Sequence, residues 1–330
     1  MTAQMKAALY EKTGPARDVL TLTDVERPEP GPGEVRVRVH ASGINPTDVK
    51  ARSGAVPRPI DGFQIPHQDG AGVIDKVGAG VDPARVGQRV WLYFAAFGSR
   101  WGTAAEWTVV PEQRAVPLPR TASMELGATM GVPALTAHRC VFADGPVAGK
   151  TVLVQGGAGA VGHYAIELAK WGGAQVVTTV SSDEKASLAR AAGADLVVNY
   201  REDDVAGQVR SFAGRADRII EVALGANLDT DLALSGPETV IVTYAADGPN
   251  PELPVRACMS ANVTLRFVLL YGVPQPRLDQ GVADITAALE QGALTPLPPH
   301  RFLLDHHAAA HEAVENGVNG KVFVIPGREV

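Results

Sequence analysis

A glycine-rich stretch in the middle of the chain has the composition of a phosphate-binding loop. It reads Gly156-Gly157-Ala158-Gly159-Ala160-Val161-Gly162. Glycines permit a tight turn and let the backbone approach a pyrophosphate, and the first N–H groups of a following helix can bind the phosphates. The stretch follows an apolar strand at 151–154 and opens a helix at 161–171, which is the context that such a loop requires. The sequence therefore predicts a dinucleotide site, against the alternative of a simple tight turn.

The end of the next strand bears on which dinucleotide is bound. An NAD site usually has an acidic residue there, about 20 residues after the loop, where it binds the ribose 2′-hydroxyl. This chain instead has Thr178-Thr179-Val180-Ser181-Ser182, with Lys185 nearby. Hydroxyls and an ammonium suit a 2′-phosphate, so we predict NADPH. Asp183 has two interpretations: an acid in the first turn of a helix, or an acceptor for the 2′-hydroxyl.

The elements around this site alternate between strands and helices. Repeated strand–helix units of this length specify a parallel sheet with helices on both faces. Strands are predicted at 151–154, 175–180, 195–199, 217–222, 239–244 and 263–270, and helices at 161–171, 183–192, 203–212, 227–234 and 278–290. Residues 1 to about 126 are instead rich in Gly, Pro and Val, with strict alternation at 35–39, which predicts an irregular β-rich domain.

Composition excludes several classes of protein. The chain has 330 residues, 30 Lys and Arg against 36 Asp and Glu, and a net charge of −6, so it lacks a broad basic surface for nucleic acid or anionic membrane. Its two cysteines, Cys140 and Cys258, form no CxxC pair, which argues against a disulfide framework and a cysteine-rich zinc site. No run of about 18 apolar residues predicts a membrane span, and no N-terminal signal pattern is present. We therefore expect a cytoplasmic protein.

Several motifs, in the correct order along nearly the whole chain, resemble the zinc-free medium-chain dehydrogenase/reductases, above all the NADPH:quinone oxidoreductase and zeta-crystallin family. They are the runs at 41–48, 52–54, 69–74, 133–137 and 320–324. The resemblance implies an α/β fold with a GroES-like β-rich catalytic domain (1–126 and 272–330) and a doubly wound Rossmann domain that binds NADPH (127–271). It also implies a homodimer, joined at or near residues 263–270, and an active site between the two domains.

The resemblance also suggests roles for individual residues. Asn45, Lys50, Thr136, Tyr244 and the run Phe267-Val268-Leu269 would lie beside the nicotinamide. Ser181, Ser182, Lys185 and Tyr200 would lie around the adenosine ribose and its phosphate, with Asn227 and Lys321 also at the cofactor.

Zinc-dependent alcohol dehydrogenases resemble this chain in fold but have a cysteine where Asn45 stands and a histidine where Gln68 stands. They also have a four-cysteine lobe in the region that here reads 94–107. Amides are poor zinc ligands, so we predict neither a catalytic nor a structural zinc. His67, next to Gln68, is interpreted as a loop residue lining the cleft rather than a metal ligand.

Three other features have competing interpretations. Lys50 stands where family members often have tyrosine; it stabilises an oxyanion by charge, or it holds a phosphate or extends into solvent. His306, His307 and His311 lack an HExxH motif, so we interpret them as a solvated helix face rather than a metal site. The aromatic residues form either local core or a wall of a flat substrate pocket; they are Trp91, Tyr93, Phe94, Phe97, Trp101 and Trp107.

The predicted reaction is hydride transfer from NADPH to a quinone or a similar electron-poor conjugated carbonyl. Without zinc, the developing oxyanion needs donors, for which Asn45 and Lys50 are candidates, and a proton comes from water or from Asp48. An enoyl or enone reductase is the alternative enzyme, since the same hydride geometry serves it. A zeta-crystallin-like NADPH- or RNA-binding protein is the alternative outside enzymes, although the negative charge disfavours RNA.

Overall fold

The computed structural model describes residues 3–246, 248 and 250–327 of the chain. These fall into two compact units, the first formed by Met1–Val132 and Pro296–Val330 and the second by Pro133–Thr295. The domain limits expected from the sequence differ from these units mainly in the segment 272–295. That segment was expected in the catalytic domain but belongs to the second unit. The reason is that helix α10 (Gln275–Glu290) packs on α4 (Leu135–Phe142), where His138 Nε2 lies 2.7 Å from Asp284 Oδ2.

The second unit is built on a parallel sheet with strand order β10-β9-β8-β11-β12-β13. This confirms the predicted parallel sheet, and the order is that of a doubly wound nucleotide fold, which reverses direction between β8 and β11. The strands are β8 (Thr151–Val154), β9 (Gln175–Val180), β10 (Leu196–Asn199), β11 (Arg218–Glu221), β12 (Val240–Thr243) and β13 (Thr264–Phe267). The last is shorter than the predicted strand at 263–270, because the 3-10 turn η4 (Leu270–Gly272) follows it.

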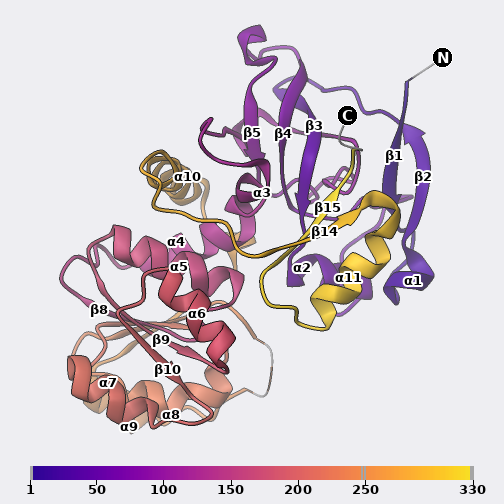
Figure 1. Ribbon diagram of the computed structural model, residues 1–330. Helices are drawn as coiled ribbons and strands as arrows, with labels where there is room; N and C mark the ends of the chain where they lie inside the picture. The colour runs from indigo at the N-terminus through magenta and orange to yellow at the C-terminus, as the bar shows by residue number, and fades with distance from the viewer. Residues whose placement is uncertain (1–2, 247, 249, 328–330) are drawn as a thin grey trace. The chain divides into compact units, whose positions relative to one another are not determined.

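Helices cover both faces of this sheet, so its central strands are continuous apolar runs. Figure 1 shows α5 and α6 on one face and α7 and α8 on the other. Besides α4 and α10, the helices of the second unit are α5 (Ala160–Trp171), α6 (Asp183–Ala191), α7 (Val205–Ala213), α8 (Leu224–Leu234) and α9 (Val255–Ala261). The core between the layers includes Leu153, Val177, Ile219 and Ile241.

The first unit is β-rich, as predicted. Its main sheet has the order β14-β15-β3-β4-β5-β7, with β6 also paired to β3, and β1 pairs separately with β2. The strands are β1 (Gln4–Leu9), β2 (Thr21–Glu26), β3 (Glu34–Gly43), β4 (Asp69–Val77), β5 (Arg89–Leu92), β6 (Trp107–Pro111), β7 (Ala115–Pro117), β14 (Pro299–Leu303) and β15 (Lys321–Ile325). The helices are α1 (Ala16–Val19), α2 (Pro46–Ser53), α3 (Met124–Gly127) and α11 (His307–Glu315); short 3-10 turns lie at η1 (Pro83–Arg85), η2 (Glu112–Arg114) and η5 (Leu304–His306), and the π-helical turn η3 (Met130–Ala134) leads into the second unit.

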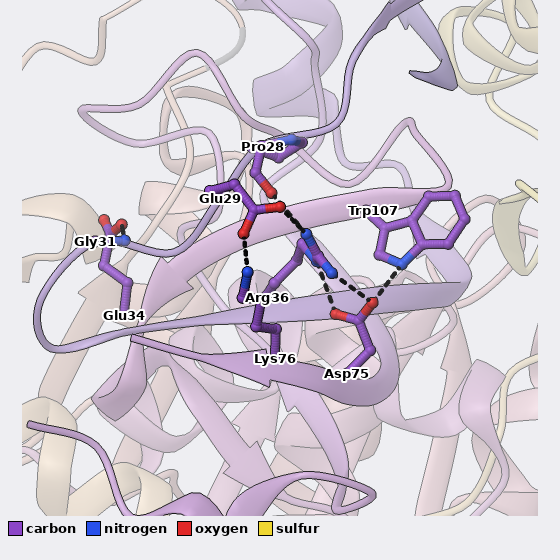
Figure 2. A network of polar contacts seen from close by, with 8 residues as sticks. All are labelled: Pro28, Glu29, Gly31, Glu34, Arg36, Asp75, Lys76 and Trp107. Carbon is purple, nitrogen blue, oxygen red and sulfur yellow. Dashed lines mark hydrogen bonds and ion pairs between the residues drawn. The ribbon is translucent and has the colours of Figure 1, made fainter. Parts of the chain in front are cut away.

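Strand β3 departs from simple alternation because one of its polar residues is buried. Val35 and Val37 are fully buried, and so is Arg36 at 5% exposure. Figure 2 shows why: the Arg36 guanidinium donates to both carboxylate oxygens of Asp75, at 2.9 and 3.1 Å, and to Glu29 at 2.7 Å. A buried arginine is tolerated when its donors are satisfied in this way, and the network ties the strand to its neighbour β4.

No helix in the ranges that the structure describes is long and apolar enough to cross a membrane.

Candidate active site

The glycine-rich loop of the second unit connects β8 to α5. Gly156 has a φ of +72°, in the left-handed region that favours glycine. A Cβ on Gly157 would lie 2.0 Å from Thr178 Oγ1, and one on Gly162 would lie 2.4 Å from the Gly156 carbonyl oxygen, so both positions exclude larger residues. Gly159 is the N-cap residue of α5, and because it has no side chain, it does not accept a hydrogen bond from the first N–H groups of the helix. The first N–H groups of the helix, from Ala160 onward, are thus available to a phosphate; Ala158 and Val161 complete the loop and the first turn.

A network of buried polar side chains holds the start of this loop through hydrogen bonds. The Gly156 N–H donates to Thr179 Oγ1 at 3.2 Å, and Thr179 Oγ1 donates to Gln155 Oε1 at 2.7 Å. Gln155 Nε2 in turn donates to Asp231 Oδ1 at 2.9 Å. Burial, and then the neighbouring Glu221 carboxylate, raise the pKa of Asp231 to about 9. The sequence reasoning missed this network, because its members come from separate strands and a helix.

The residues expected at the adenosine ribose come together at the end of β9. Ser182 caps α6, its Oγ accepting from the Lys185 N–H at 3.4 Å. The Lys185 ammonium folds back to donate to Ser181 Oγ at 3.0 Å. Asp183 is the first residue of α6, where a negative charge is favoured by the helix dipole. Tyr200 follows β10 and is 53% exposed, so its ring is accessible.

The other residues of the second unit expected at the cofactor are spread over several elements. Thr136 lies on α4 and is 6% exposed. Asn227 on α8 donates to both oxygens of Glu221, at 3.1 and 3.2 Å. Tyr244 follows β12, and burial raises the pKa of its phenol. Phe267 ends β13 and is 73% exposed, Leu269 is 72% exposed, and the half-buried Val268 lies between them.

In the first unit, Asn45 lies at the centre of a buried charged cluster. Its Nδ2 donates to Asp69 Oδ2 at 2.7 Å, and its Oδ1 accepts from Lys321 Nζ at 2.6 Å. Asp48 caps the start of α2, with its Oδ2 accepting from the Asn45 N–H at 2.8 Å. These four side chains are all 3% exposed or less. Lys50 lies in the last turn of α2 and is half-buried.

Burial and mutual charge shift the titration of this cluster. Burial, and then the Asp69 carboxylate, raise the pKa of Asp48 to about 7. Burial raises the pKa of Asp69 to about 6, against the opposing charge of Lys321. Burial also lowers the pKa of Lys321, while the two carboxylates hold its proton. The cluster therefore combines a carboxyl group that can carry a proton near neutral pH with a fixed cation and an amide donor.

The sequence predicts Asn45, Asp48 and Lys50 as catalytic residues and Lys321 as a cofactor residue, and it assigns no role to Asp69. The structure brings Lys321 to Asn45, which is 276 positions away in the chain. Asp69 is fixed further by the Val132 N–H, which donates to its Oδ1 at 2.8 Å. Its position at the start of β4, beside Gln68, was the signal that could have indicated it.

The donors at the two positions where zinc enzymes have ligands do not fit a zinc ion. The Asn45 oxygen is held by the Lys321 ammonium at 2.6 Å, so a metal cation there would meet a fixed positive charge. Gln68 supplies only an amide, whose buried Oε1 has no hydrogen-bond partner among the described residues. Within the same part of the chain, no three His, Cys, Asp or Glu side chains come together as a metal site.

The structure corrects the interpretation of the histidines. His307 is 5% exposed and His311 is fully buried, so they do not form a solvated helix face; only the His306 side chain, 65% exposed, does so. His67 is also fully buried, with its Nε2 2.9 Å from His311 Nε2. The reason is that α11 presents its histidines to the interior of the first unit. His67 itself borders a small pocket that Asp48 and Gln68 also line.

The aromatic residues of the 91–107 region do not form a single cluster. Trp91, Tyr93 and Phe94 are at most 3% exposed and contact one another in sequence, with ring centroids 5.8 and 5.3 Å apart. The local-core interpretation is confirmed for these three. Trp101 instead packs on Phe63, with centroids 5.6 Å apart, and Trp107 donates to Asp75 at 2.9 Å (Figure 2).

Comparisons with known proteins agree with this architecture. The profile of the "Alcohol dehydrogenase GroES-like domain" family matches residues 31–120, and that of the "Zinc-binding dehydrogenase" family matches residues 160–287. The rat (Rattus norvegicus) quinone oxidoreductase is 31% identical over 96% of this chain and 96% of its own length. A solved mycobacterial quinone oxidoreductase is 30% identical, with a TM-score of 0.85 over 98% of this chain and all of that one. A mycobacterial structure in complex with NADPH is 29% identical, with a TM-score of 0.84 over 98% of this chain and all of that one.

A GroES-like unit and a doubly wound nucleotide-binding unit with a glycine loop together define a medium-chain dehydrogenase/reductase. Within that superfamily the chain belongs to the quinone oxidoreductase family, to which zeta-crystallin-like proteins also belong.

Proposed function

We propose that this chain transfers a hydride from NADPH to a quinone without the help of zinc. The observation that carries the proposal is the contact of Lys321 with Asn45, at 2.6 Å. It places a protein cation and an amide at the position that zinc-dependent relatives give to a metal ligand. A quinone is electron-poor and can accept a hydride without a metal to polarise it, whereas the zinc-dependent alcohol dehydrogenases use their metal to polarise the oxygen of the substrate. The relatives of this chain in rat and in mycobacteria carry the name quinone oxidoreductase.

NADPH, when bound, supplies the hydride. The glycine loop and the start of α5 hold its pyrophosphate, because Gly156, Gly157 and Gly162 leave the backbone accessible there. Ser181, Ser182 and Lys185 hold the 2′-phosphate, since they offer hydroxyls and an ammonium where an NAD site has a carboxylate. A mycobacterial relative binds the same cofactor. We further propose that the second unit is the cofactor-binding domain and the first the catalytic domain.

Reduction of a quinone to a hydroquinone takes up one hydride and one proton. The Asn45 amide has a second N–H besides the one donated to Asp69, and we assign it to the oxygen on which negative charge develops. Asp48 is the proton source, because its buried carboxyl has a pKa raised to about 7. Lys321 stabilises the oxyanion by charge through Asn45. Lys50 remains a second candidate for this electrostatic role.

The test is steady-state oxidation of NADPH and of NADH by the chelator-treated protein, with a quinone panel and an enone panel side by side. We expect quinone-dependent turnover that prefers NADPH and survives chelation. Turnover with enones alone would transfer the function to the enoyl or enone reductase class. Loss of activity on chelation would refute the zinc-free mechanism.

A homodimer in the cytoplasm stays a prediction. Support for the dimer comes from β13, an edge strand of the sheet of the second unit. Its end exposes Phe267, and Leu269 follows, at 73% and 72% exposure. Exposed apolar residues on a free strand edge are a common site of subunit pairing. Sedimentation of the purified protein tests this, with Phe267→Lys expected to give monomers.

A further inference from the structure

A chain of buried hydrogen bonds runs through the first unit from α11 to Asp69, the first residue of β4. His311 Nε2 lies 2.9 Å from His67 Nε2, and His67 Nδ1 lies 2.8 Å from Ser42 Oγ. Ser42 Oγ lies 2.7 Å from Thr103 Oγ1, which donates to the main-chain carbonyl of Asp69 at 2.6 Å. His67, His311, Ser42 and Thr103 are all fully buried. The chain therefore ends on a residue of the candidate active site.

The last bond fixes the direction of every other bond. Thr103 has one hydroxyl hydrogen and gives it to a carbonyl, so it must accept from Ser42. Ser42 then has no further hydrogen and must accept from the Nδ1–H of His67. The Nε2 of a neutral His67 carries a lone pair, so it accepts from the Nε2–H of His311. Both tautomers are thereby determined: His67 is protonated at Nδ1 and His311 at Nε2.

The backbone at His67 points to the same role. Its φ is +78°, a left-handed conformation that glycine adopts freely and a bulky residue does not. Such an outlier persists where the surroundings hold it, and it is frequently functional. Both ring nitrogens of His67 are used, so the imidazole itself holds this conformation.

We propose that His67 and His311 are positioning residues of the active site, which act as a neutral pair with fixed tautomers to hold Asp69 in place. Asp69 in turn holds the Asn45 amide, whose Nδ2 donates to its Oδ2 at 2.7 Å. The pair thus sets the direction of the remaining Asn45 N–H. This inference rests on the proposed function in assigning that N–H to the acceptor, but its structural part is independent of any substrate.

The groups around the pair all favour the neutral state. Burial first, and then His311, His307 and Lys321, lower the pKa of His67. Burial, and then Arg52 on α2 and His307, lower the pKa of His311 to about 3. His311 Nδ1 is buried with no partner among the described residues, so a second proton there would have no acceptor. Burial of both rings and the missing acceptor at His311 Nδ1 therefore favour the neutral state of the pair.

The structural part is tested by nitrogen-15 NMR of the histidine rings in the full-length protein, with the signals assigned from the His67→Asn and His311→Gln variants. We expect a neutral Nδ1–H tautomer for His67 and a neutral Nε2–H tautomer for His311. Both tautomers should stay unchanged from about pH 5.5 to about 8, a range in which an ordinary histidine gains or loses its second proton. A His67 protonated at Nε2, or one that takes up a second proton near pH 6, overturns the proposal. This result does not depend on whether the protein reduces quinones.

The positioning part is tested with two matched pairs of variants. His311→Gln keeps an N–H donor at the place of Nε2, whereas His311→Leu removes it. His67→Asn keeps the donor to Ser42 and tolerates the left-handed backbone, whereas His67→Gly relieves the backbone and removes the ring. We expect kcat for quinone reduction to fall about tenfold in the Leu and Gly variants, with NADPH binding unchanged, because small displacements of a donor cost that much. The Gln variant should stay within about threefold of the wild type.

His67→Gly is the sharpest of these, since a glycine would serve the backbone better than histidine does. A Gly variant with wild-type kcat, or a Leu variant impaired only in stability and not in kcat, overturns the proposal. If the wild type reduces no quinone at all, the proposed function fails, and the NMR result alone decides between a fixed and a freely titrating pair.

Discussion

Replacing Lys321 with methionine should expose how the buried charges at Asn45 are balanced. Lys321 is 3% exposed and is the cation whose charge opposes both Asp48 and Asp69. Removing one partner from a buried charged cluster costs about 3–5 kcal/mol, because it leaves the other charge without compensation. For a unit of this size the melting temperature falls about 2–4 °C per kcal/mol, or about 6–20 °C in all.

The loss should depend on pH in a direction that follows from the same charges. Without the ammonium, the pKa values of Asp48 and Asp69 rise further, so the folded protein keeps their protons to higher pH than the unfolded chain does. The stability of Lys321→Met therefore falls more steeply than that of the wild type as the pH rises from about 5 to about 8. The double variant with Asp69→Asn removes one of the two stranded carboxylates and should recover part of the loss, which a double-mutant cycle measures.

Thermal melts followed by circular dichroism at pH 5.5 and 8 provide the assay. Lys76→Met is the matched control, since that ammonium pairs with Glu29 at the surface with a side-chain exposure of 52% (Figure 2), and exposed pairs contribute little. A Lys321→Met protein that melts with the wild type at pH 8, or one whose deficit is the same at both pH values, would refute the electrostatic account of the cluster.

Three further predictions concern the second unit. Gly157→Ala should lower the melting temperature clearly, because its Cβ would lie 2.0 Å from Thr178 Oγ1, whereas Gly159→Ala, with its nearest contact at 3.5 Å, should change it little; equal melts would contradict the steric argument. Lys185→Met should weaken NADPH binding about tenfold in fluorescence titrations, the value of one charge-assisted hydrogen bond, and leave NADH binding unchanged. Asp231→Asn should reduce the fall in the free energy of unfolding between about pH 5 and 8, measured by urea unfolding. An acid with a folded pKa of about 9 stabilises the fold at low pH and loses that contribution as the pH rises. If the wild type and the variant lose stability equally over this range, Asp231 is not protonated in the fold.

The sequence predicted those parts of the fold and site that depend on local rules. The strands of the second unit can be predicted because burial on both faces makes them apolar runs, as in 151–154. The glycine loop can be predicted because its steric constraints lie within a few residues, as with Gly156 and Gly162. The hydroxyls and the lysine at the end of β9 are found in the same way, from their position after the second strand of the alternating strand–helix pattern.

The parts that could not be predicted depend on contacts between distant segments. Lys321 reads as the start of a closing strand, and nothing near it in the sequence indicates its bond to Asn45, 276 residues away. His311 reads as a polar position on an alanine-rich helix, so a solvated face was the natural interpretation. Its partner His67 is 244 residues away. A buried histidine differs from an exposed one only in its surroundings, which the local sequence does not contain.

The buried carboxyl and imidazole groups of the first unit make its free energy of unfolding depend on pH in opposite directions. Asp48 has a folded pKa of about 7, above its unfolded value, so its contribution is present at low pH and is lost as the pH rises toward 7. His311 has a folded pKa of about 3, below its unfolded value, so its contribution is present above pH 6.5 and is lost as the pH falls. Between about pH 4 and 6.5 the two trends offset each other. His311→Gln removes one of them, so its unfolding free energy should decline with rising pH by roughly 1.4 kcal/mol per unit more than that of the wild type in this window. Urea unfolding followed by tryptophan fluorescence at half-unit pH steps measures the slope, and identical slopes would mean that His311 is not held neutral.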